Sequence, residues 1–334
     1  MSLIVPKKPQ ILYAPMLSSF GGGSARGFNP GGGGGPVEFE LRFLVIGGGG
    51  GGGDGNASGG AGGAGTLIEV AGTMTTDESI VFTATSGQGG YGGGSDNSGV
   101  DGYPSRFKNA AGTLDVTAYG GGLGASYHSA ASYSGGEVGG SGGGGSGPSN
   151  NNQRGIAGQT QYLLTTSALT GVSAAAYANE GSSWNGGGSY GYGGGGGGAG
   201  GAAGSNSQRG PGRYYNWIAG SSIEYAAGGQ GAGTEVGQSG GRVDTYGSGG
   251  GGLGDESRTG SSQESDGFVG AVMIRVPDTV VLSDITRTSG PAGYTVENLN
   301  DGGYNNYAFG NQTMTPTSGI LTADAVYTFK IVPA

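Results

Sequence analysis

The residue types that most often carry chemistry are sparse in this sequence, and their spacing predicts no catalytic site. The chain has no cysteine and one histidine, His128, which excludes disulfides, thiolate zinc sites and histidine-pair metal sites. No acid and serine are arranged around His128 as in a catalytic triad, so we interpret it as a loop residue. Glycan hydrolysis needs two carboxylates across a cleft, and the nearest acids, Asp255-Glu256 and Glu264 with Asp266, are typical of solvated turns.

Motifs for phosphate and calcium are equally weak. Patterns of the form GxGxxG occur, but no βαβ unit or downstream acidic partner follows them, and no Gly-Lys-Ser/Thr is present. Asp54-Gly55-Asn56 and the segment 96–101 contain oxygen ligands suited to calcium. No ligand spacing repeats, so we interpret both as tight polar turns. The sequence therefore predicts no enzyme, no cofactor and no metal site.

The charge pattern limits the classes of partner. Lys and Arg number 14 and Asp and Glu 23, for a net charge of -9, and Lys7-Lys8 is the only adjacent pair of bases. Because phosphate backbones bind clustered bases, we expect no nucleic acid partner. No apolar run approaches the roughly 18 residues of a membrane span, so we expect no membrane insertion. The N-terminal residues lack the order of a secretion signal, which predicts synthesis in a bacterial-type cytosol without export.

Glycine dominates the composition, with 87 of 334 residues, about a quarter of the chain against a usual share of roughly 7%. Collagen needs glycine at every third position, whereas here it clusters in runs such as Gly47–Gly53 and Gly193–Gly198. Disorder normally accompanies high charge and few aromatics, whereas this chain has 18 Tyr, 9 Phe and only 11% charged residues.

A third explanation is a lattice of polyproline II helices made of glycine, also called polyglycine II. Such helices have three residues per turn and no internal hydrogen bonds. Only glycine lets neighbouring helices approach closely enough to supply each other's backbone partners. The glycine runs alternate with turn-competent segments, as a chain that folds back many times requires.

Alternating apolar residues predict β-strands at both ends of the glycine-rich part. Residues 36–46 predict one strand, 66–86 predict two strands around a polar turn, and 267–282 predict a further strand run that could pair with the first. The last residues alternate Val326, Thr328 and Lys330 against Tyr327, Phe329 and Ile331. A helix over 160–180 is disfavoured by its glycine, threonine and serine.

The predicted fold class is all-β, with a glycine-rich polyglycine II lattice framed by β-strands. We expect three parts. Residues 1–35 would form an extended leader, 36–282 the glycine-rich domain with variable loops, and 283–334 a small C-terminal β-domain, since glycine falls toward normal there.

Several segments carry a resemblance to a known family. These are the strand FLVIGGGGGGG followed by GGAGGAGTLIEV, the hairpin return DESIVFTATSGQGG, the closing GFVGAVMIRVP and the leader LYAPMLSSFGGGSARGF. Together, over roughly residues 10–280, they resemble the glycine-rich domain of bacteriophage tail fibre and virion structural proteins. The resemblance implies a polyglycine II sandwich whose loops bind a host receptor, and a leader that attaches to the virion. Its attachment candidates are Tyr13, Pro15, Phe20, Arg26 and Phe28.

Aromatic residues in the segments between glycine blocks are the candidate receptor contacts. Tyr beside Ser, Gly and Asn makes effective recognition surfaces, although the same rings could instead cover the glycine lattice. The candidates are Tyr103, Phe107, Tyr127, Tyr133, Trp184, Tyr190, Tyr192, Tyr214, Tyr215, Trp217 and Tyr225.

These observations predict a non-enzymatic tail fibre or adhesin located in the virion. Its expected partners are other virion proteins, through the leader, and a bacterial surface glycan or outer-membrane protein. We also expect a homo-oligomer, for example a trimer. The alternative is a purely structural decoration protein of the head or tail without receptor binding.

Overall fold

The computed structural model describes a large part of the chain, and only this part is discussed. Contacts separate Met1–Gly35 from a compact unit, Pro36–Ala334. The five candidate attachment residues of the leader lie outside the described part. The described residues are 36–55, 58–76, 80–94, 97–126, 140–146, 162–185, 191–217, 221–233, 239–254, 264–289, 296–300, 303–310 and 324–334.

The fold is all-β, as predicted, and the described residues contain no helix. Two six-stranded antiparallel sheets and a two-stranded sheet contain all named strands. In order, the first sheet consists of β12 (Val296–Asn300), β13 (Tyr304–Phe309), β10 (Ala271–Pro277), β1 (Val37–Ile46), β2 (Leu67–Thr76) and β7 (Leu169–Tyr177). The second consists of β11 (Val280–Ser289), β14 (Ala325–Pro333), β3 (Val81–Ser86), β4 (Ser105–Asn109), β5 (Asp115–Ala118) and β6 (Tyr162–Thr165). The small sheet pairs β8 (Arg213–Tyr215) with β9 (Ile223–Tyr225).

Strand β1 confirms the strand predicted over 36–46. Its first half alternates apolar inward residues with exposed Glu38, Glu40 and Arg42, as a strand with one wet face should. β10 pairs antiparallel with β1, with Ile274 opposite Phe43. The strand run predicted over 267–282 therefore closes against the first strand, and it continues into β11.

The segment 66–86 contains the two predicted strands, but they are not paired as a hairpin. β2 pairs with β1 and β7, whereas β3 pairs with β14 and β4 in the other sheet. The crossing lets the apolar sides of the two sheets meet: Phe43 of β1 lies edge-on to Phe107 of β4, with ring centroids 4.9 Å apart. Phe107 also stacks with Phe82 of β3 and Phe329 of β14.

The last strands complete both sheets instead of forming the separate domain expected over residues 283–334. β12 and β13 extend the first sheet beyond β10, and β11 and β14 extend the second beyond β3. The alternation predicted for the final strand is confirmed, because Tyr327, Phe329 and Ile331 are buried and the intervening residues are partly exposed. Burial of these rings between the sheets ties the C-terminal strands to the main core. Residues 162–165 and 169–177 are strands, in agreement with the prediction that a helix over 160–180 is disfavoured.

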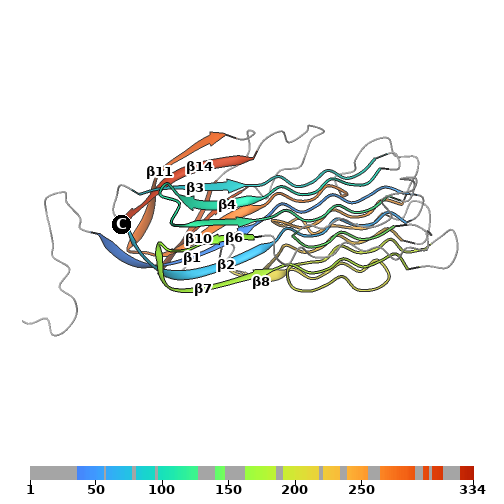
Figure 1. Cartoon of the computed structure of the whole chain (residues 1–334), viewed down its shortest axis with the longest axis horizontal. Coiled ribbons are helices and arrows are strands. Elements are labelled where there is room, and N and C mark those ends of the chain that lie inside the picture. The colour runs from blue at the N-terminus through green and yellow to red at the C-terminus, as the bar shows by residue number, and fades with distance from the viewer. Residues whose placement is uncertain are drawn as a thin grey trace, which may run out of the picture. The chain divides into compact units, whose positions relative to one another are not determined.

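Beyond the strand ends, the glycine-rich segments run side by side without forming sheets (Figure 1). Segment 47–54 continues directly from β1 and lies among six others. Its N–H groups donate to three segments that run antiparallel to it, 60–66, 97–103 and 265–268. Its carbonyl groups accept from three parallel segments, 90–93, 121–124 and 250–253.

The partners repeat every three residues. Gly47, Gly50 and Gly53 all donate to segment 60–66, with N···O distances of 3.0, 2.8 and 2.8 Å. Gly48 and Gly51 donate to segment 97–103, at 2.9 and 2.8 Å. Each successive backbone group therefore faces a different neighbour, and the segment satisfies its hydrogen bonds without a sheet.

The segments lie too close together for side chains. A Cβ placed on Gly50 would lie 2.7 Å from the Gly121 carbonyl oxygen and closer still to that of Gly122. At every position from Gly47 to Gly53 an added Cβ would overlap backbone atoms of a neighbouring segment. Backbone cannot move aside as a flexible side chain can, so this region requires glycine.

Candidate binding surface

The predicted aromatic contacts divide into three groups: those that are exposed or half-buried, those that lie outside the described residues, and those that are buried. Tyr103, Tyr192 and Tyr214 are exposed, by 42%, 36% and 62%, and Trp184 and Tyr215 are half-buried. Tyr127, Tyr133 and Tyr190, together with His128, lie outside the described residues. The third group, Phe107, Trp217 and Tyr225, is buried in the core.

The buried group packs against other rings and is not available to a ligand. Tyr225 stacks with Tyr246 at 6.2 Å between ring centroids, and Tyr246 lies edge-on to Phe268 at 6.4 Å. Trp217 lies edge-on to Tyr215 at 5.7 Å. These rings cover the junction between strands and glycine segments, in keeping with the packing alternative that the sequence left open.

Tyr215 is held in place by polar contacts as well. Its hydroxyl donates to Glu69 Oε2 on β2 at 3.0 Å. Burial raises the pKa of Tyr215 far above its ordinary value, and the Glu69 carboxylate adds to the shift. The phenol therefore stays protonated and keeps donating, which ties β8 to the first sheet.

The β8–β9 hairpin, which carries exposed Tyr214, is fixed by a two-pronged ion pair. The two terminal guanidinium nitrogens of Arg209, Nη1 and Nη2, each donate to one oxygen of the Glu224 carboxylate at 2.9 Å. The Gly212 backbone N–H also donates to Glu224, at 2.8 Å. The hydrogen bonds from Arg209 hold the pKa of Glu224 below its ordinary value. Tyr214 is thus displayed on a braced element.

A second exposed patch follows the three-residue repeat. Segments 88–94 and 97–103 run antiparallel at the surface, where the Val100 and Tyr103 N–H groups donate to the carbonyls of Tyr91 and Gln88. Val100 and Tyr103 are three residues apart and both 42% exposed. Sequence reasoning selected Tyr103 but missed Val100. In a segment whose neighbours repeat every three residues, residues i and i+3 face the same way, so the spacing from Tyr103 could have indicated Val100.

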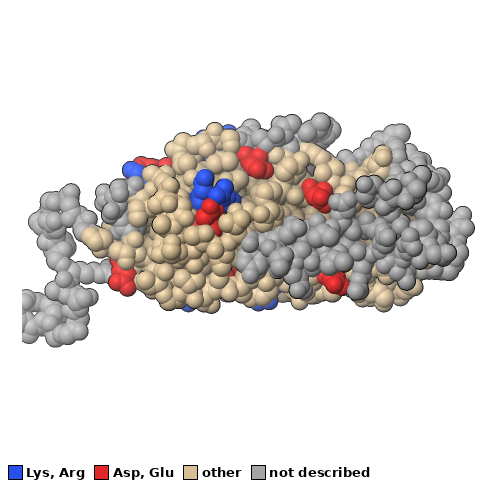
Figure 2. Space-filling view, viewed as in Figure 1, with Lys and Arg blue, Asp and Glu red and all other residues tan. Residues whose placement is uncertain are grey.

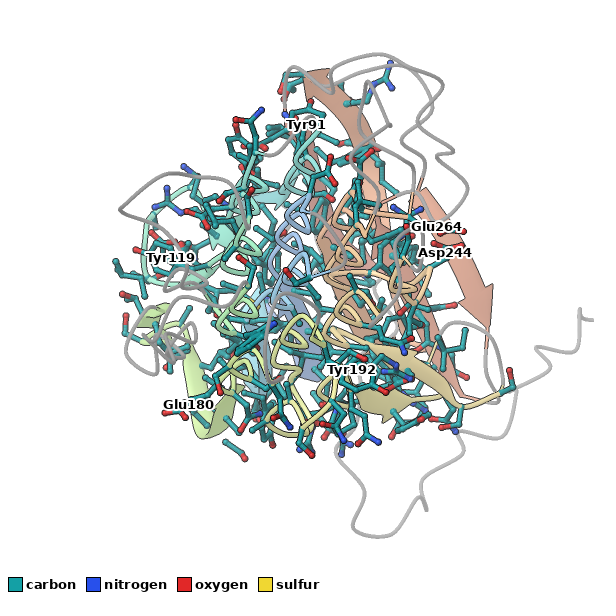
Figure 3. The ribbon with its side chains drawn as sticks, turned by 90° about the vertical axis from the view of Figure 1, so that its right-hand side faces the viewer. Tyr91, Tyr119, Glu180, Tyr192, Asp244 and Glu264 are labelled. Atoms are coloured by element: carbon teal, nitrogen blue, oxygen red, sulfur yellow. The ribbon has the colours of Figure 1, made fainter. Side chains whose placement is uncertain are left out.

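The most polar cluster lies where segment 181–185 meets residues 191–193 and 205–207. Asn185 and Tyr192 exchange backbone hydrogen bonds at 3.1 and 3.0 Å. Asn185 Nδ2 donates to Asn206 Oδ1 at 2.7 Å, and all three residues are exposed. Figure 3 shows the glycine-rich segments end-on, with Tyr192 among the labelled side chains around them.

Sequence reasoning chose Trp184 and Tyr192 here and missed Asn185 and Asn206. The two asparagines are 21 residues apart in sequence, and asparagine is common between the glycine blocks. Asn206 has a left-handed backbone with φ 58°, which Asn tolerates better than most residues, but only the structure reveals this conformation. Pairing of the segments, which repetitive glycine conceals, brings the two amides together.

The acids singled out in the sequence do not form a catalytic pair among the described residues. Residues 255 and 256 lie outside the described part. Asp266 Oδ1 accepts the Gly92 N–H at 2.8 Å, and burial raises the pKa of its carboxyl. Asp101 accepts the Leu123 N–H at 2.8 Å. Both carboxylates thus bind backbone, as structural turn residues do.

The surface offers few charges for an ionic ligand. On the face shown in Figure 2, the described charged side chains are scattered, and where they meet, acidic and basic groups lie side by side. Within the described part of the chain, no three His, Asp or Glu side chains gather closely enough to hold a metal ion. The same residues include no helix that could cross a membrane.

Two antiparallel sheets and a glycine-rich region of mutually hydrogen-bonded segments define a glycine-rich all-β protein. The sequence matches the family described as a glycine-rich domain over residues 38–277, from β1 to the end of β10. Because the match covers most of the chain, the protein belongs to this family. A comparison with curated proteins finds no match.

Proposed function

We propose that the glycine-rich segments form a polyglycine II lattice that acts as a rigid display scaffold. A polyproline II helix has three residues per turn, and the hydrogen-bond partners of segment 47–54 change with the same period. Six neighbours, three donating and three accepting, are what a three-fold helix without internal hydrogen bonds needs. The overlap of any added Cβ supports helices packed at backbone distance.

On this scaffold, we propose, aromatic-bearing segments recognise a receptor on a bacterial surface, as in a bacteriophage tail fibre or adhesin. One observation carries the proposal: Tyr103, Tyr192 and Tyr214 are exposed at the edge of a region whose interior is made of hydrogen-bonded backbone. Rigid aromatic groups on a braced support bind with little loss of conformational entropy.

The wider assignment rests on the resemblance given by the sequence. In it, residues 1–35 attach the chain to other virion proteins, and the exposed aromatics contact a surface glycan or an outer-membrane protein. Copies of the chain would assemble in the virion after synthesis in the host cytoplasm.

Adsorption to cells tests the proposal directly. Labelled full-length protein is incubated with a panel of bacterial strains, and bound label is measured with and without excess unlabelled protein. We expect saturable binding to at least one strain and at least tenfold weaker binding by a Tyr103→Ser, Tyr192→Ser, Tyr214→Ser triple variant. Saturable binding that the triple variant retains in full would reject the aromatic site. Binding to no strain, with labelled protein located on the particle as decoration, would favour the purely structural alternative.

A further inference from the structure

Three segments of the glycine-rich region form one polar corner, consisting of Trp184, Asn185, Tyr192 and Asn206. Asn185 and Tyr192 are directly opposite each other in a two-residue antiparallel bridge. Side chains of directly opposite residues lie on the same side of such a pair. The Tyr192 ring and the Asn185 amide therefore border the same patch of surface, and Asn206 extends that patch through its hydrogen bond to Asn185.

The amide pair leaves hydrogen-bonding capacity facing outward. Asn185 gives one side-chain amide hydrogen to Asn206 Oδ1. Within the described part of the chain, the side-chain oxygen of Asn185 and the side-chain amino group of Asn206 make no hydrogen bond. One is an acceptor and the other a donor. Neighbouring hydroxyl groups of a sugar can each both donate and accept, so this pair can engage two of them at once.

Trp184 adds a second aromatic group behind the patch. Its indole lies across Gly191, the residue before Tyr192, where any Cβ would meet ring atoms at 2.6 Å. Among the described residues, the buried indole N–H has no hydrogen-bond partner. Buried donors without partners are rare in native proteins and call for a specific explanation.

The corner carries no formal charge. The described segments 181–185, 191–193 and 205–207 contain no Asp, Glu, Lys, Arg or His. An anionic or cationic ligand would lose hydration here without gaining a counter-ion. A neutral ligand with an apolar face and closely spaced hydroxyls matches the ring and the amides.

We propose that this corner binds a neutral saccharide, with a pyranose face against Tyr192 and two adjacent hydroxyls on the Asn185–Asn206 amide pair. The inference rests on the proposed receptor-binding function and gives that function a ligand class. A folded protein partner fits less well, because protein interfaces centre on buried apolar anchors over about 800 Å² per partner. The Asn185–Tyr192 backbone bridge holds the ring and amides in place before binding.

An array of neutral and acidic oligosaccharides, probed with the full chain, tests the inference. The neutral set contains oligomers of glucose, galactose, mannose and N-acetylglucosamine, and the acidic set contains sialylated and uronate oligomers. The affinity for any ligand found is then measured by calorimetry. We expect at least one neutral oligosaccharide to bind and at least tenfold weaker binding by Tyr192→Ala and by Asn206→Ala. Leu163→Ala is the control, because it removes an exposed apolar side chain on β6, outside the corner and outside the proposed receptor contacts, and should leave the affinity unchanged.

Several outcomes would overturn the inference: binding to no neutral oligosaccharide, preference for the acidic set, or equal loss in Leu163→Ala. Cell adsorption separates this failure from failure of the proposed function. If the protein adsorbs to bacteria but ignores neutral saccharides, the corner is not a saccharide site and the receptor is of another class. If it binds the saccharide but no cell, the corner is supported and the adhesin role is wrong. Asn206→Ala with native circular dichroism excludes misfolding as the cause of lost binding.

Discussion

The two ends of this molecule build a solid interior in opposite ways. Between the sheets, Phe43, Phe82, Phe107 and Phe329 fill the core with stacked and edge-on rings. In the glycine-rich region the interior contains backbone hydrogen-bonded to backbone, and the glycine runs such as Gly47–Gly53 leave no room for a side chain. The comparison teaches that close packing does not require large side chains, provided that every backbone donor and acceptor finds a partner.

The difference predicts opposite responses to mutation. The sandwich should be sensitive to loss of volume, because burial of apolar surface stabilises it. The glycine-rich region should be sensitive to gain of volume, because its stability depends on the approach of neighbouring chains. Charge should matter little in either, since described ion pairs lie at the surface or at the junction.

Truncating the sandwich core should have the largest effect. Phe107→Ala removes a fully buried ring that contacts Phe43, Phe82 and Phe329, and we expect the free energy of unfolding to fall by about 4 kcal/mol. Denaturant unfolding followed by circular dichroism measures this. Phe107→Leu, which keeps most of the volume, should lose less than half as much. Equal losses in the two variants would contradict a volume-dependent core.

Adding one methyl group to the glycine interior should have the next largest effect. Gly50→Ala places a Cβ against the carbonyls of Gly121 and Gly122, and we expect destabilisation of about 3 kcal/mol. The control is Gly241→Ala, whose Cβ would have its nearest neighbour, Gln230 Oε1, at 3.8 Å. Thermal unfolding of both variants gives the difference. If both variants melt alike, the glycine runs are not packed at backbone distance.

Removing a charge at the junction should have the smallest effect. Glu224 has a pKa lowered mainly by Arg209, so its ion pair stabilises the fold above the ordinary pKa, and this contribution disappears as pH falls through the lowered value. We expect Glu224→Gln to cost about 1 kcal/mol at pH 7.

The difference between wild type and Glu224→Gln should shrink toward pH 3, which unfolding measured at pH 7, 5 and 3 will show. Asp244→Asn serves as the control, because the Asp244 side chain is 72% exposed beside Arg242 and its removal should change little. A wild-type advantage that grows on acidification would have the wrong sign and would reject this account of Glu224.

Sequence periodicity predicted the strands well because one face of each is buried. The alternation in residues 36–46 and at the C-terminus corresponds to β1 and β14, and the pairing of β10 with β1 followed from two apolar runs of similar length. The assignment of β2 and β3 to different sheets could not be predicted. Only four residues lie between the two strands, and a connection of this length also suits a hairpin loop. Placement of the C-terminal strands failed for a related reason: falling glycine content marks a change of packing, which need not be a domain boundary.

The candidate site was only partly predictable. Aromatic type identified Tyr103, Tyr192 and Tyr214, which are exposed, but it also selected Phe107 and Tyr225, which are buried. Local sequence around an aromatic does not state which side of a segment faces solvent. Partner segments are even harder to predict, because one glycine run can align with any other, so the meeting of Asn185 with Asn206 needed three-dimensional information.

The three-residue alternation of neighbours in segment 47–54 restricts how such a chain can change length during evolution. In the proposed polyglycine II helix, inserting one residue would rotate all later backbone groups by about a third of a turn. Each later N–H donor would then face the wrong neighbouring segment. Inserting three would lengthen the segment by about 9 Å and restore the pattern. Lineages of this architecture should therefore grow or shrink in triplets within the glycine runs, while their turns vary freely.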